Sequence, residues 1–223
     1  MSEIPVVRDV LDDNAAGAAA NRARFAAAGV YVMNLMSGPG AGKTTLMERT
    51  AVACRGRLRI AVVAGDIETR RDADRIARHG VPVEQVNTGG ACHMDARMLE
   101  GALSRIDLAS LDALIIENVG NLVCPAEFDL GEHDKVMILS VTEGADKPAK
   151  YPLMFSEARL MVLGKTDLLP YVDFDPHAAI ADARTLNPDL EVIRLSSRTG
   201  EGIEDWISWI ERRRASRVGG TKD

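Results

Sequence analysis

Short apolar runs alternate along the chain with amphipathic segments, and this alternation predicts the fold. The runs have the length and composition of buried strands, and they occupy residues 30–36, 59–65, 82–87, 112–119, 135–142, 158–165 and 190–196. Segments with helical spacing occupy residues 43–54, 69–80, 94–106, 175–187 and 202–217. Because most of the strands are apolar throughout, we expect a mostly parallel sheet covered on both faces. The predicted fold class is α/β, with three layers: a mostly parallel central sheet flanked by helices.

The two ends of the chain differ from this alternating middle. Residues 6–28 are rich in alanine and have a helical pattern that Gly29 ends, so they form one helix or two. The last residues lack a pattern that would hold them to the core. We therefore expect a helical extension at residues 1–28, one domain at residues 29–217 and a frayed tail at residues 218–223.

Composition limits the classes of function. Of the 223 residues, 46% are hydrophobic and 27% are charged, a profile typical of globular proteins. No apolar run is long enough to span a bilayer, and residues 1–14 lack the basic and apolar parts of a signal peptide. A net charge of −6 without a dense basic block does not favour nucleic acid as a partner. We therefore expect a cytoplasmic protein that binds neither membranes nor nucleic acid.

The stretch Ser-Gly-Pro-Gly-Ala-Gly-Lys-Thr-Thr, residues 37–45, lies between a predicted strand and a predicted helix. Glycines there let the backbone turn and direct N–H groups at an anion, and the helix N-terminus adds a positive dipole end. Lys43 would reach the β- and γ-phosphates of a nucleotide, and the Thr44 hydroxyl would bind Mg²⁺. The alternative is a glycine-rich turn without a ligand, and Ser37 departs from the glycine that usually opens a phosphate loop. The residues expected around the nucleotide phosphates are Gly38, Gly40, Ala41, Gly42, Lys43, Thr44 and Thr45.

A second motif bears on the identity of the base. Lys165 and Asp167, just after an apolar strand, resemble the N-K-x-D motif with which GTPases recognise guanine, although Gly164 replaces the Asn. A buried Asp carboxylate would accept from guanine N1–H and its amino group and would be left unpaired by adenine. The loop after the next strand is similar to a second guanine loop, with backbone N–H groups near Ser196 and Ser197 placed to contact guanine O6. Taken alone, the first motif is also compatible with a surface turn. In this order after the phosphate loop, the motifs indicate GTP or GDP.

Two acidic residues end predicted core strands, Asp66 and Glu117. A buried carboxylate is costly unless it binds a cation or hydrogen-bond donors, and Mg²⁺ is the natural cation beside a nucleotide. We expect both residues, together with Thr44, to bind Mg²⁺ or to position the attacking water, and Lys43, Asp66 and Glu117 to be the catalytic residues. The alternatives are a helix-capping role for Asp66 and a backbone-bonded role for Glu117.

Two cysteines and a histidine follow neighbouring strands. Cys92 and His93 come after the strand at residues 82–87, and Cys124 comes after the strand that ends near Glu117. Because carboxyl ends of parallel strands share one edge, these side chains are expected to lie near the phosphate loop. Two thiolates and an imidazole are good ligands for Zn²⁺ or Ni²⁺, with water, another side chain or a second protomer completing the set. Buried free cysteines are also common. Cys54, on the helix after the phosphate loop, has no partner nearby in the sequence and is interpreted as a core or surface thiol.

The motifs together resemble one family. The stretches at residues 34–46, 65–76, 85–98, 117–125, 141–152, 165–175 and 199–210 are similar to the HypB family of GTPase accessory proteins in nickel–iron hydrogenase maturation, relatives of UreG. The resemblance covers nearly the whole chain, and its usual Ser-x-Pro-Gly start accounts for Ser37. It implies a P-loop GTPase domain at residues 29–217 with inserted metal-binding loops.

The resemblance also implies a mechanism and partners. It implies a GTP-dependent homodimer with a Ni²⁺ or Zn²⁺ site at the interface, built from Cys92, His93 and Cys124. It implies nickel delivery to the hydrogenase large subunit with a HypA-like accessory protein. Lys147 could reach the nucleotide of a second subunit, or be a solvated lysine. The alternatives are a P-loop kinase or ATPase of another class and a non-catalytic scaffold that binds GTP and metal.

Overall fold

The computed structural model describes residues 5–66 and 71–218, which fold around one sheet. Its seven strands lie in the order β3-β2-β4-β1-β5-β6-β7. The predicted three-layer α/β class with its mostly parallel central sheet is confirmed, and every described strand pair is parallel. The strands are β1 (Tyr31–Ser37), β2 (Ile60–Asp66), β3 (Val83–Asn87), β4 (Ala113–Glu117), β5 (Asp134–Ser140), β6 (Leu160–Gly164) and β7 (Glu191–Arg194).

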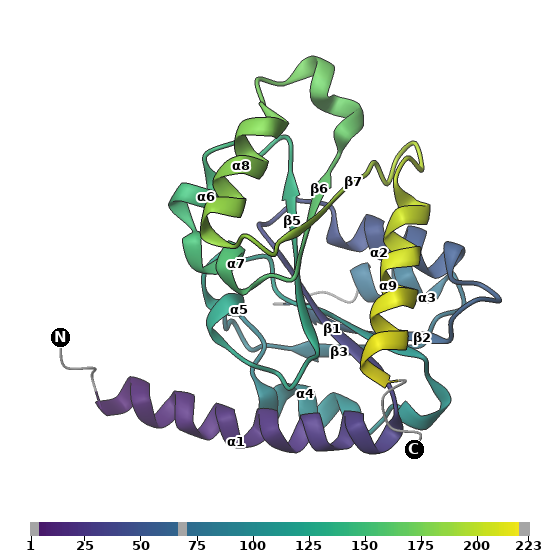
Figure 1. Ribbon diagram of the computed structural model, residues 1–223. Helices are drawn as coiled ribbons and strands as arrows, with labels where there is room; N and C mark the ends of the chain where they lie inside the picture. The colour runs from purple at the N-terminus through teal and green to yellow at the C-terminus, as the bar shows by residue number, and fades with distance from the viewer. Residues whose placement is uncertain (1–4, 67–70, 219–223) are drawn as a thin grey trace.

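Helices cover both faces of the sheet, as Figure 1 shows. Leu46, Ile76 and Trp206 lie in the core between one face and the helices α2 (Lys43–Ala53), α3 (Arg71–Ala77) and α9 (Ile203–Val218). The other helices are α1 (Pro5–Ala28), α4 (Ala96–Leu103), α5 (Cys124–Glu127), α6 (Lys147–Lys150), α7 (Pro152–Glu157) and α8 (Pro176–Leu186), with the 3-10 turns η1 (Leu108–Ser110) and η2 (Thr166–Tyr171). Of these, α1, α4, α5, α7 and α8 supply side chains to the core on the second face.

The observed helices differ from the predicted ones mainly at their ends. α1 is a single helix, and Gly29, with φ 63°, ends it. Asp95 caps α4 by accepting a hydrogen bond from Met98 N–H at 2.7 Å, so this helix begins two residues later than predicted. The predicted start of α3 at residues 69 and 70 and most of the predicted tail, residues 219–223, lie outside the described residues. α5, α6 and α7 are too short to give a periodic pattern and were not predicted.

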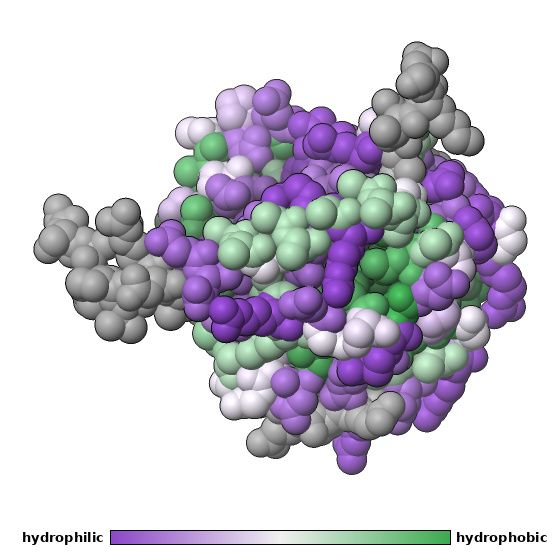
Figure 2. Space-filling view, turned by 90° about the horizontal axis from the view of Figure 1, so that it is seen from below, coloured by the Kyte–Doolittle hydropathy of each residue, from purple (hydrophilic) through white to green (hydrophobic). Residues whose placement is uncertain are grey.

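α1 crosses the underside of the molecule and attaches to α4. Figure 2 shows it from below as a pale, weakly hydrophobic ridge flanked by hydrophilic side chains, as its alanine content requires. Gly17 allows close packing, because a Cβ there would lie 3.1 Å from Ala96 Cβ. The Asn14 and Asn21 side chains hydrogen-bond the N–H and the carbonyl oxygen of Ala96, each at 2.9 Å. The extension therefore supports the chain segment that follows Cys92 and His93.

Charged residues at the amino ends of the strands form ion pairs. Asp134, at the start of β5, accepts from Tyr31 Oη at 2.7 Å and from two guanidinium nitrogens of Arg213 at 2.9 and 2.6 Å. Asp112, just before β4, accepts from Arg59 at 3.0 Å and from Arg214 at 2.6 Å. These contacts hold α9 and the start of β2 to the sheet. Among the described residues, no helix combines the length and the apolar character needed to cross a bilayer.

Candidate functional site

The carboxyl edge of the sheet carries a cavity of about 460 Å³. It lies where β1, β2 and β4 end, between the start of α2 and the side of α3. The phosphate-loop residues Gly40, Lys43 and Thr44 line it together with Glu117. This volume lies within the range of about 300–1,000 Å³ typical of small-molecule sites.

The chain between β1 and α2 has the backbone of an anion-binding loop. Gly40 and Gly42 have φ values of 73° and 107°, a left-handed region in which a side chain is strained. The loop therefore turns sharply before α2 begins at Lys43, and the first N–H groups of α2 are directed toward the cavity. Lys43 Nζ donates to Ser37 Oγ at 2.8 Å, so the serine in place of the usual glycine holds the lysine. Burial lowers the pKa of Lys43, an effect that Glu117, Glu143 and Asp72 oppose.

Two other glycines bring neighbouring loops against this one. A Cβ on Gly38 would collide with the carboxylate of Glu143, in the loop after β5. A Cβ on Gly120 would lie 3.0 Å from Pro39 Cα and 3.4 Å from Lys43 Nζ. The sequence analysis missed Gly120, although its position three residues after Glu117, at the end of a strand, was an available signal.

Glu117 has the geometry of a cation ligand. Its Oε1 accepts from Thr44 Oγ1 at 3.0 Å, and its Oε2 is a buried oxygen without a hydrogen-bond partner among the described residues. Burial raises the pKa of Glu117 to about 6, while Lys43 acts in the opposite direction. A buried carboxylate oxygen with a spare lone pair beside a threonine hydroxyl fits the oxygen ligands that Mg²⁺ prefers. Asp66 ends β2, but its side chain lies outside the part of the structure that is described.

Two charged residues of α3, which the sequence analysis missed, also line this cavity. Asp72 and Arg75 lie one helical turn apart, with Arg75 Nη1 3.2 Å from an Asp72 oxygen. Arg75 also contacts Glu48 of α2 at 2.6 Å and Thr45 Oγ1 at 3.4 Å. The signal was a run of mixed charges in a helix, a pattern that ordinary solvated helices share, so the sequence alone did not single them out.

A second cavity, of about 210 Å³, lies beside the first, and Lys165, Asp167 and Ser197, which were predicted to contact the base, line it. Lys165 has a positive φ of 59°, and its Nζ donates to the Gly40 carbonyl oxygen at 2.8 Å across the phosphate loop. Asp167 accepts from Ser196 Oγ at 2.5 Å and from Arg198 Nε at 2.7 Å. These hydrogen bonds lower the pKa of Asp167, so the carboxylate is kept ionised. Apolar walls for a planar base come from Leu46, Ile138, Val162, Leu168 and Leu195.

The structure gives the backbone of Ser196, one of the two residues predicted to contact the base, another partner. The Ser196 N–H donates to the carbonyl oxygen of Glu201 at 2.9 Å, so it is already engaged within its own loop. Its hydroxyl instead orients Asp167. Ser197 lines the cavity, and its carbonyl oxygen accepts from Arg49 Nε at 2.6 Å, which fixes this loop to α2. Ser197 is therefore the better placed of the two residues for contact with a base.

Cys92, His93 and Cys124 meet at the same edge of the sheet. One ligand atom from each lies within 4.8 Å of those of the other two, and this is a grouping that could hold a metal ion. The two Sγ atoms are 2.9 Å apart, and Cys92 Sγ is 3.7 Å from His93 Nδ1. Hydrogen bonding with Cys92 raises the pKa of the Cys124 thiol, and burial lowers the pKa of His93. Two sulfurs and a neutral imidazole fit the donor preferences of Zn²⁺ and Ni²⁺.

Local contacts place these three side chains. Cys124 begins α5, where Asn121 Nδ2 lies 3.5 Å from its sulfur. The His93 ring stacks on Phe128, with ring centroids 3.8 Å apart. The other cysteine, Cys54, is 1% exposed in the core of the opposite face, and burial raises the pKa of its thiol to about 11. Lys147 Nζ contacts the Glu143 carbonyl oxygen and Asp146 of its own loop.

Comparison with known proteins gives a consistent result. Residues 31–194 match the family model described as CobW/HypB/UreG, nucleotide-binding domain. The chain is 56% identical over 213 residues to the hydrogenase maturation factor HypB of Azotobacter vinelandii, covering 96% of this chain and 70% of that protein. It is 53% identical over 208 residues to HypB of Escherichia coli (strain K12), covering 93% and 72%.

Two solved structures have the same fold. HypB from Helicobacter pylori, crystallised in complex with nickel, superposes with a TM-score of 0.89 at 38% identity, covering 95% of this chain and 99% of that one. HypB from Archaeoglobus fulgidus superposes with a TM-score of 0.86 at 38% identity, covering 92% and 100%.

Proposed function

This chain belongs to the HypB hydrogenase maturation factors of the CobW/HypB/UreG family, and from that premise we propose that it is a GTP-hydrolysing metallochaperone. It would bind nickel or zinc through Cys92, His93 and Cys124 and assist nickel insertion into a nickel–iron hydrogenase. The observation that carries the proposal is the shared edge: the cysteine–histidine cluster and the nucleotide cavity lie at the carboxyl ends of neighbouring strands, and the chain that leaves β4 lines the cavity at Glu117 and Gly120 before it reaches Cys124. A nucleotide-driven change in these loops would therefore reach the metal ligands.

The residues of the first cavity would divide the work of hydrolysis. Lys43 and the N–H groups at the start of α2 would neutralise the β- and γ-phosphates, because buried donors fixed in advance stabilise the charge that develops in the transition state. Thr44 and Glu117 would hold Mg²⁺ through a hydroxyl and a carboxylate oxygen. Asp72, which lines this cavity, and Asp66, at the end of β2, would orient the attacking water. Arg75 would supply positive charge from the side of α3.

The second cavity would select guanine. Asp167 would accept from the guanine N1–H and amino group, with Ser196 holding the carboxylate and Lys165 covering the base from the phosphate-loop side. An Asp167→Asn variant should lose GDP affinity while its ADP affinity stays low. Competition binding with both nucleotides measures this difference. A variant with unchanged preference for GDP over ADP would remove the basis for a GTPase and favour a P-loop enzyme of another class.

The metal site would be completed outside a single protomer. Three donors lie together, whereas structural and transport sites usually provide four or more. Val123, directly before Cys124, is 47% exposed, which leaves this surface open to a second copy of the chain. A GTP-dependent homodimer pairing the two clusters would double the ligand set. Release would pass nickel to the hydrogenase large subunit, with a HypA-like accessory protein as partner.

The deciding experiment is a titration of Ni²⁺ and of Zn²⁺ into the metal-free protein, once with GDP and once with a non-hydrolysable GTP analogue, with mass recorded at each point. We expect metal affinity and dimerisation to differ between the two nucleotide states. A Cys92→Ala/Cys124→Ala variant should lose the metal, and a Cys54→Ala variant, which removes a buried thiol elsewhere, should keep it. Equal affinity in both states, or normal binding by the double variant, would overturn the proposal.

A further inference from the structure

Two consecutive residues at the end of β4 reach the two sites. The Glu117 side chain bonds Thr44 in the nucleotide cavity. The next side chain, Asn118, is 1% exposed and bonds the segment that carries Cys92 and His93. Its Oδ1 accepts from Met94 N–H at 3.0 Å. One step along the backbone therefore separates a contact inside the nucleotide cavity from a contact to the residue that follows His93.

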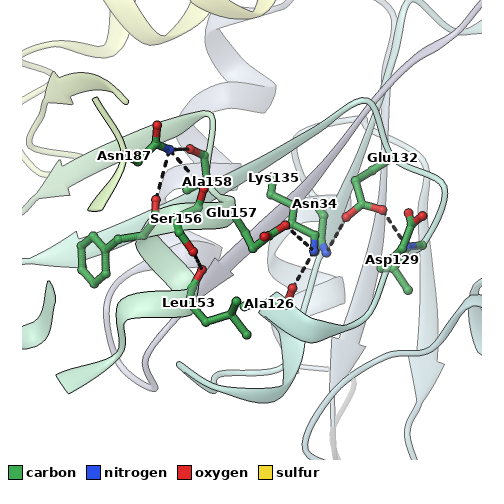
Figure 3. Close-up of polar contacts among 12 residues, drawn as sticks. Asn34, Ala126, Asp129, Glu132, Lys135, Leu153, Ser156, Glu157, Ala158 and Asn187 are labelled. Atoms are coloured by element: carbon green, nitrogen blue, oxygen red, sulfur yellow. Dashed lines mark hydrogen bonds and ion pairs between the residues drawn. The ribbon is translucent and has the colours of Figure 1, made fainter. Parts of the chain in front are cut away.

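The orientation of the Asn118 amide is fixed by its partners. Its Oδ1 accepts from two backbone N–H groups, those of Met94 and Val119, so its amino group must face the other way. There Asn118 Nδ2 donates to Asn34 Oδ1 at 3.2 Å, and Asn34 in turn donates to Glu132 Oε1 at 3.4 Å. Figure 3 shows the side chains of Asn34 and Glu132 facing one another. Asn34 is fully buried in β1, the strand that leads into the phosphate loop.

Packing leaves little room for these segments to move separately. A Cβ on Gly65, in β2, would lie 2.9 Å from Met94 Cε and 3.4 Å from the Glu117 carbonyl oxygen. The main chain itself leads from Asn118 to the third member of the cluster. It passes Gly120, which packs against Pro39, and reaches Cys124 at the start of α5. Close-packed contacts transmit small displacements instead of absorbing them. A shift at the end of β4 would thus reach Cys92 and His93 through the Asn118 side chain and Cys124 through the chain itself.

We propose that Asn118 is the positioning residue that couples the nucleotide cavity to the Cys92–His93–Cys124 cluster, with Asn34 and Glu132 setting its orientation. The inference rests on the proposed function, because it assigns a residue to the coupling between nucleotide and metal. A change at Glu117 between nucleotide states moves the Asn118 main chain. The Asn118 amide then moves Met94 and, with it, the imidazole of His93. By linkage, metal on the cluster alters nucleotide affinity by the same factor.

The first test needs no metal. Amide hydrogen exchange of residues 92–94 is followed in the full chain with saturating GDP and with a saturating non-hydrolysable GTP analogue. We expect the exchange rate at Met94 to differ between the two nucleotides in the wild type. In Asn118→Ala, it should be fast and equal in both. An equal rate in the wild type, or a wild-type difference that persists in Asn118→Ala, overturns the inference.

The second test measures the coupling itself. The ratio of Ni²⁺ dissociation constants with the two nucleotides is determined at nucleotide saturation. Allosteric coupling typically lies at about 5–150-fold, and Asn118→Ala should bring the ratio close to one. Glu132→Gln keeps the volume of the side chain, but its new amino group can donate to Asn34. The amides of Asn34 and Asn118 could then adopt the reversed orientation in some molecules. We therefore expect a smaller reduction of the ratio than in Asn118→Ala. This ratio compares two states of one variant, so a general loss of stability does not produce the effect.

A matched control comes from another asparagine in Figure 3. Asn187 is half-buried, and its amino group donates to the carbonyl oxygens of Phe155, Ser156 and Ala158 at 3.2, 3.3 and 2.8 Å, away from both sites. Asn187→Ala should lose stability and keep the wild-type ratio. If the wild type itself shows equal nickel affinity with both nucleotides, the proposed function fails. If the wild-type ratio is large and survives in Asn118→Ala, only the role of Asn118 fails.

Discussion

Asp134, at the amino edge of the sheet, receives two hydrogen bonds from Arg213 and one from Tyr31, whereas Glu117, at the carboxyl edge, receives one from Thr44 and keeps a buried oxygen without a partner among the described residues. Both acids sit at the ends of central strands, and both side chains are almost fully buried. The guanidinium of Arg213 neutralises the first charge within the fold. The Glu117 carboxylate lies beside a cavity. Burial raises its pKa, and the nearby Lys43 offsets only part of that rise.

The difference separates structural from functional acids within one sheet. A buried carboxylate that is paired with arginine has its charge neutralised within the fold, and its removal leaves the cation without its partner. A buried carboxylate with an oxygen that accepts no hydrogen bond destabilises the fold when it is ionised. Such groups occur typically where a cation or a reacting group binds. Substitutions at the two edges should therefore have opposite consequences.

The largest effect on stability is expected at the amino edge. Asp134→Ala leaves Arg213, whose side chain is only 13% exposed, without its partner, and breaking a buried pair costs about 3–5 kcal/mol. Urea unfolding measures the change, and GDP binding by the folded fraction should be retained. A loss below about 1 kcal/mol would mean that the pair is no stronger than a surface ion pair.

The largest effect on activity is expected at the carboxyl edge. Glu117→Gln keeps the shape of the side chain but removes the negative charge that would face Mg²⁺. We expect GTP turnover to fall by about 10²–10³-fold, the magnitude typical for loss of one preorganised electrostatic contact. Single-turnover hydrolysis measures this, and the free energy of unfolding should not decrease, because a buried charge has been removed. Undiminished turnover together with lower stability would make Glu117 a structural acid like Asp134.

The two edges should also respond to pH with opposite signs. Burial raises the pKa of Glu117 to about 6, above the unfolded value of about 4.3, so the native state binds more protons between these values. The Glu117 contribution therefore lowers stability as the pH rises from about 4.3 to 6, by roughly 2 kcal/mol. At the amino edge, hydrogen bonding by Arg59 lowers the pKa of Asp112, so its contribution is present above its unfolded pKa and is lost as the pH falls through its folded pKa.

Unfolding free energies across this pH range, in the wild type and two variants, check these signs. Glu117→Gln should flatten the fall of stability with rising pH, whereas Asp112→Asn should flatten the loss on acidification. Parallel pH curves for wild type and Glu117→Gln would place the carboxylate in a more solvated setting than its contacts indicate.

The smallest effect is expected where a carboxyl-edge acid does have an arginine. Asp167 pairs with Arg198, but the Arg198 side chain is 75% exposed, and such pairs are worth about 0.2–1 kcal/mol. Arg198→Ala should therefore change GDP affinity by no more than about fivefold, and isothermal titration measures it. A change of a hundredfold would mean that Arg198 contacts the nucleotide directly.

Much of this arrangement follows from the sequence. Apolar strands alternating with helices determine a parallel sheet, and a parallel sheet brings its strand ends to one edge. That rule alone predicts that Cys92 and Cys124 lie near the phosphate loop, and their sulfurs are 2.9 Å apart. Their role as metal ligands stays a prediction, as do the roles assigned to Lys43, Asp66 and Glu117.

The remainder depends on partners that are distant in sequence. Asn118 bonds Asn34, 84 residues away, and no local pattern marks an asparagine as the buried connection between two loops. The Ser196 N–H was predicted to face a base, but the turn of its own loop directs it to Glu201. Asp72 and Arg75 belong to a helix of ordinary charge pattern, and only the packing of α3 beside α2 brings them to the cavity.

The hydrogen bond between Lys43 and Ser37 has a consequence for the entropy of association. A free lysine side chain has about 2 kcal/mol of rotamer entropy, and a binding site that must order it loses that amount from its affinity. Here a hydrogen bond to Ser37 Oγ, at 2.8 Å, holds the ammonium group in place without any contact to a phosphate. Ordering of Lys43 is therefore part of the folding of β1 and α2, and a phosphate group that arrives at the loop meets a cation already in place.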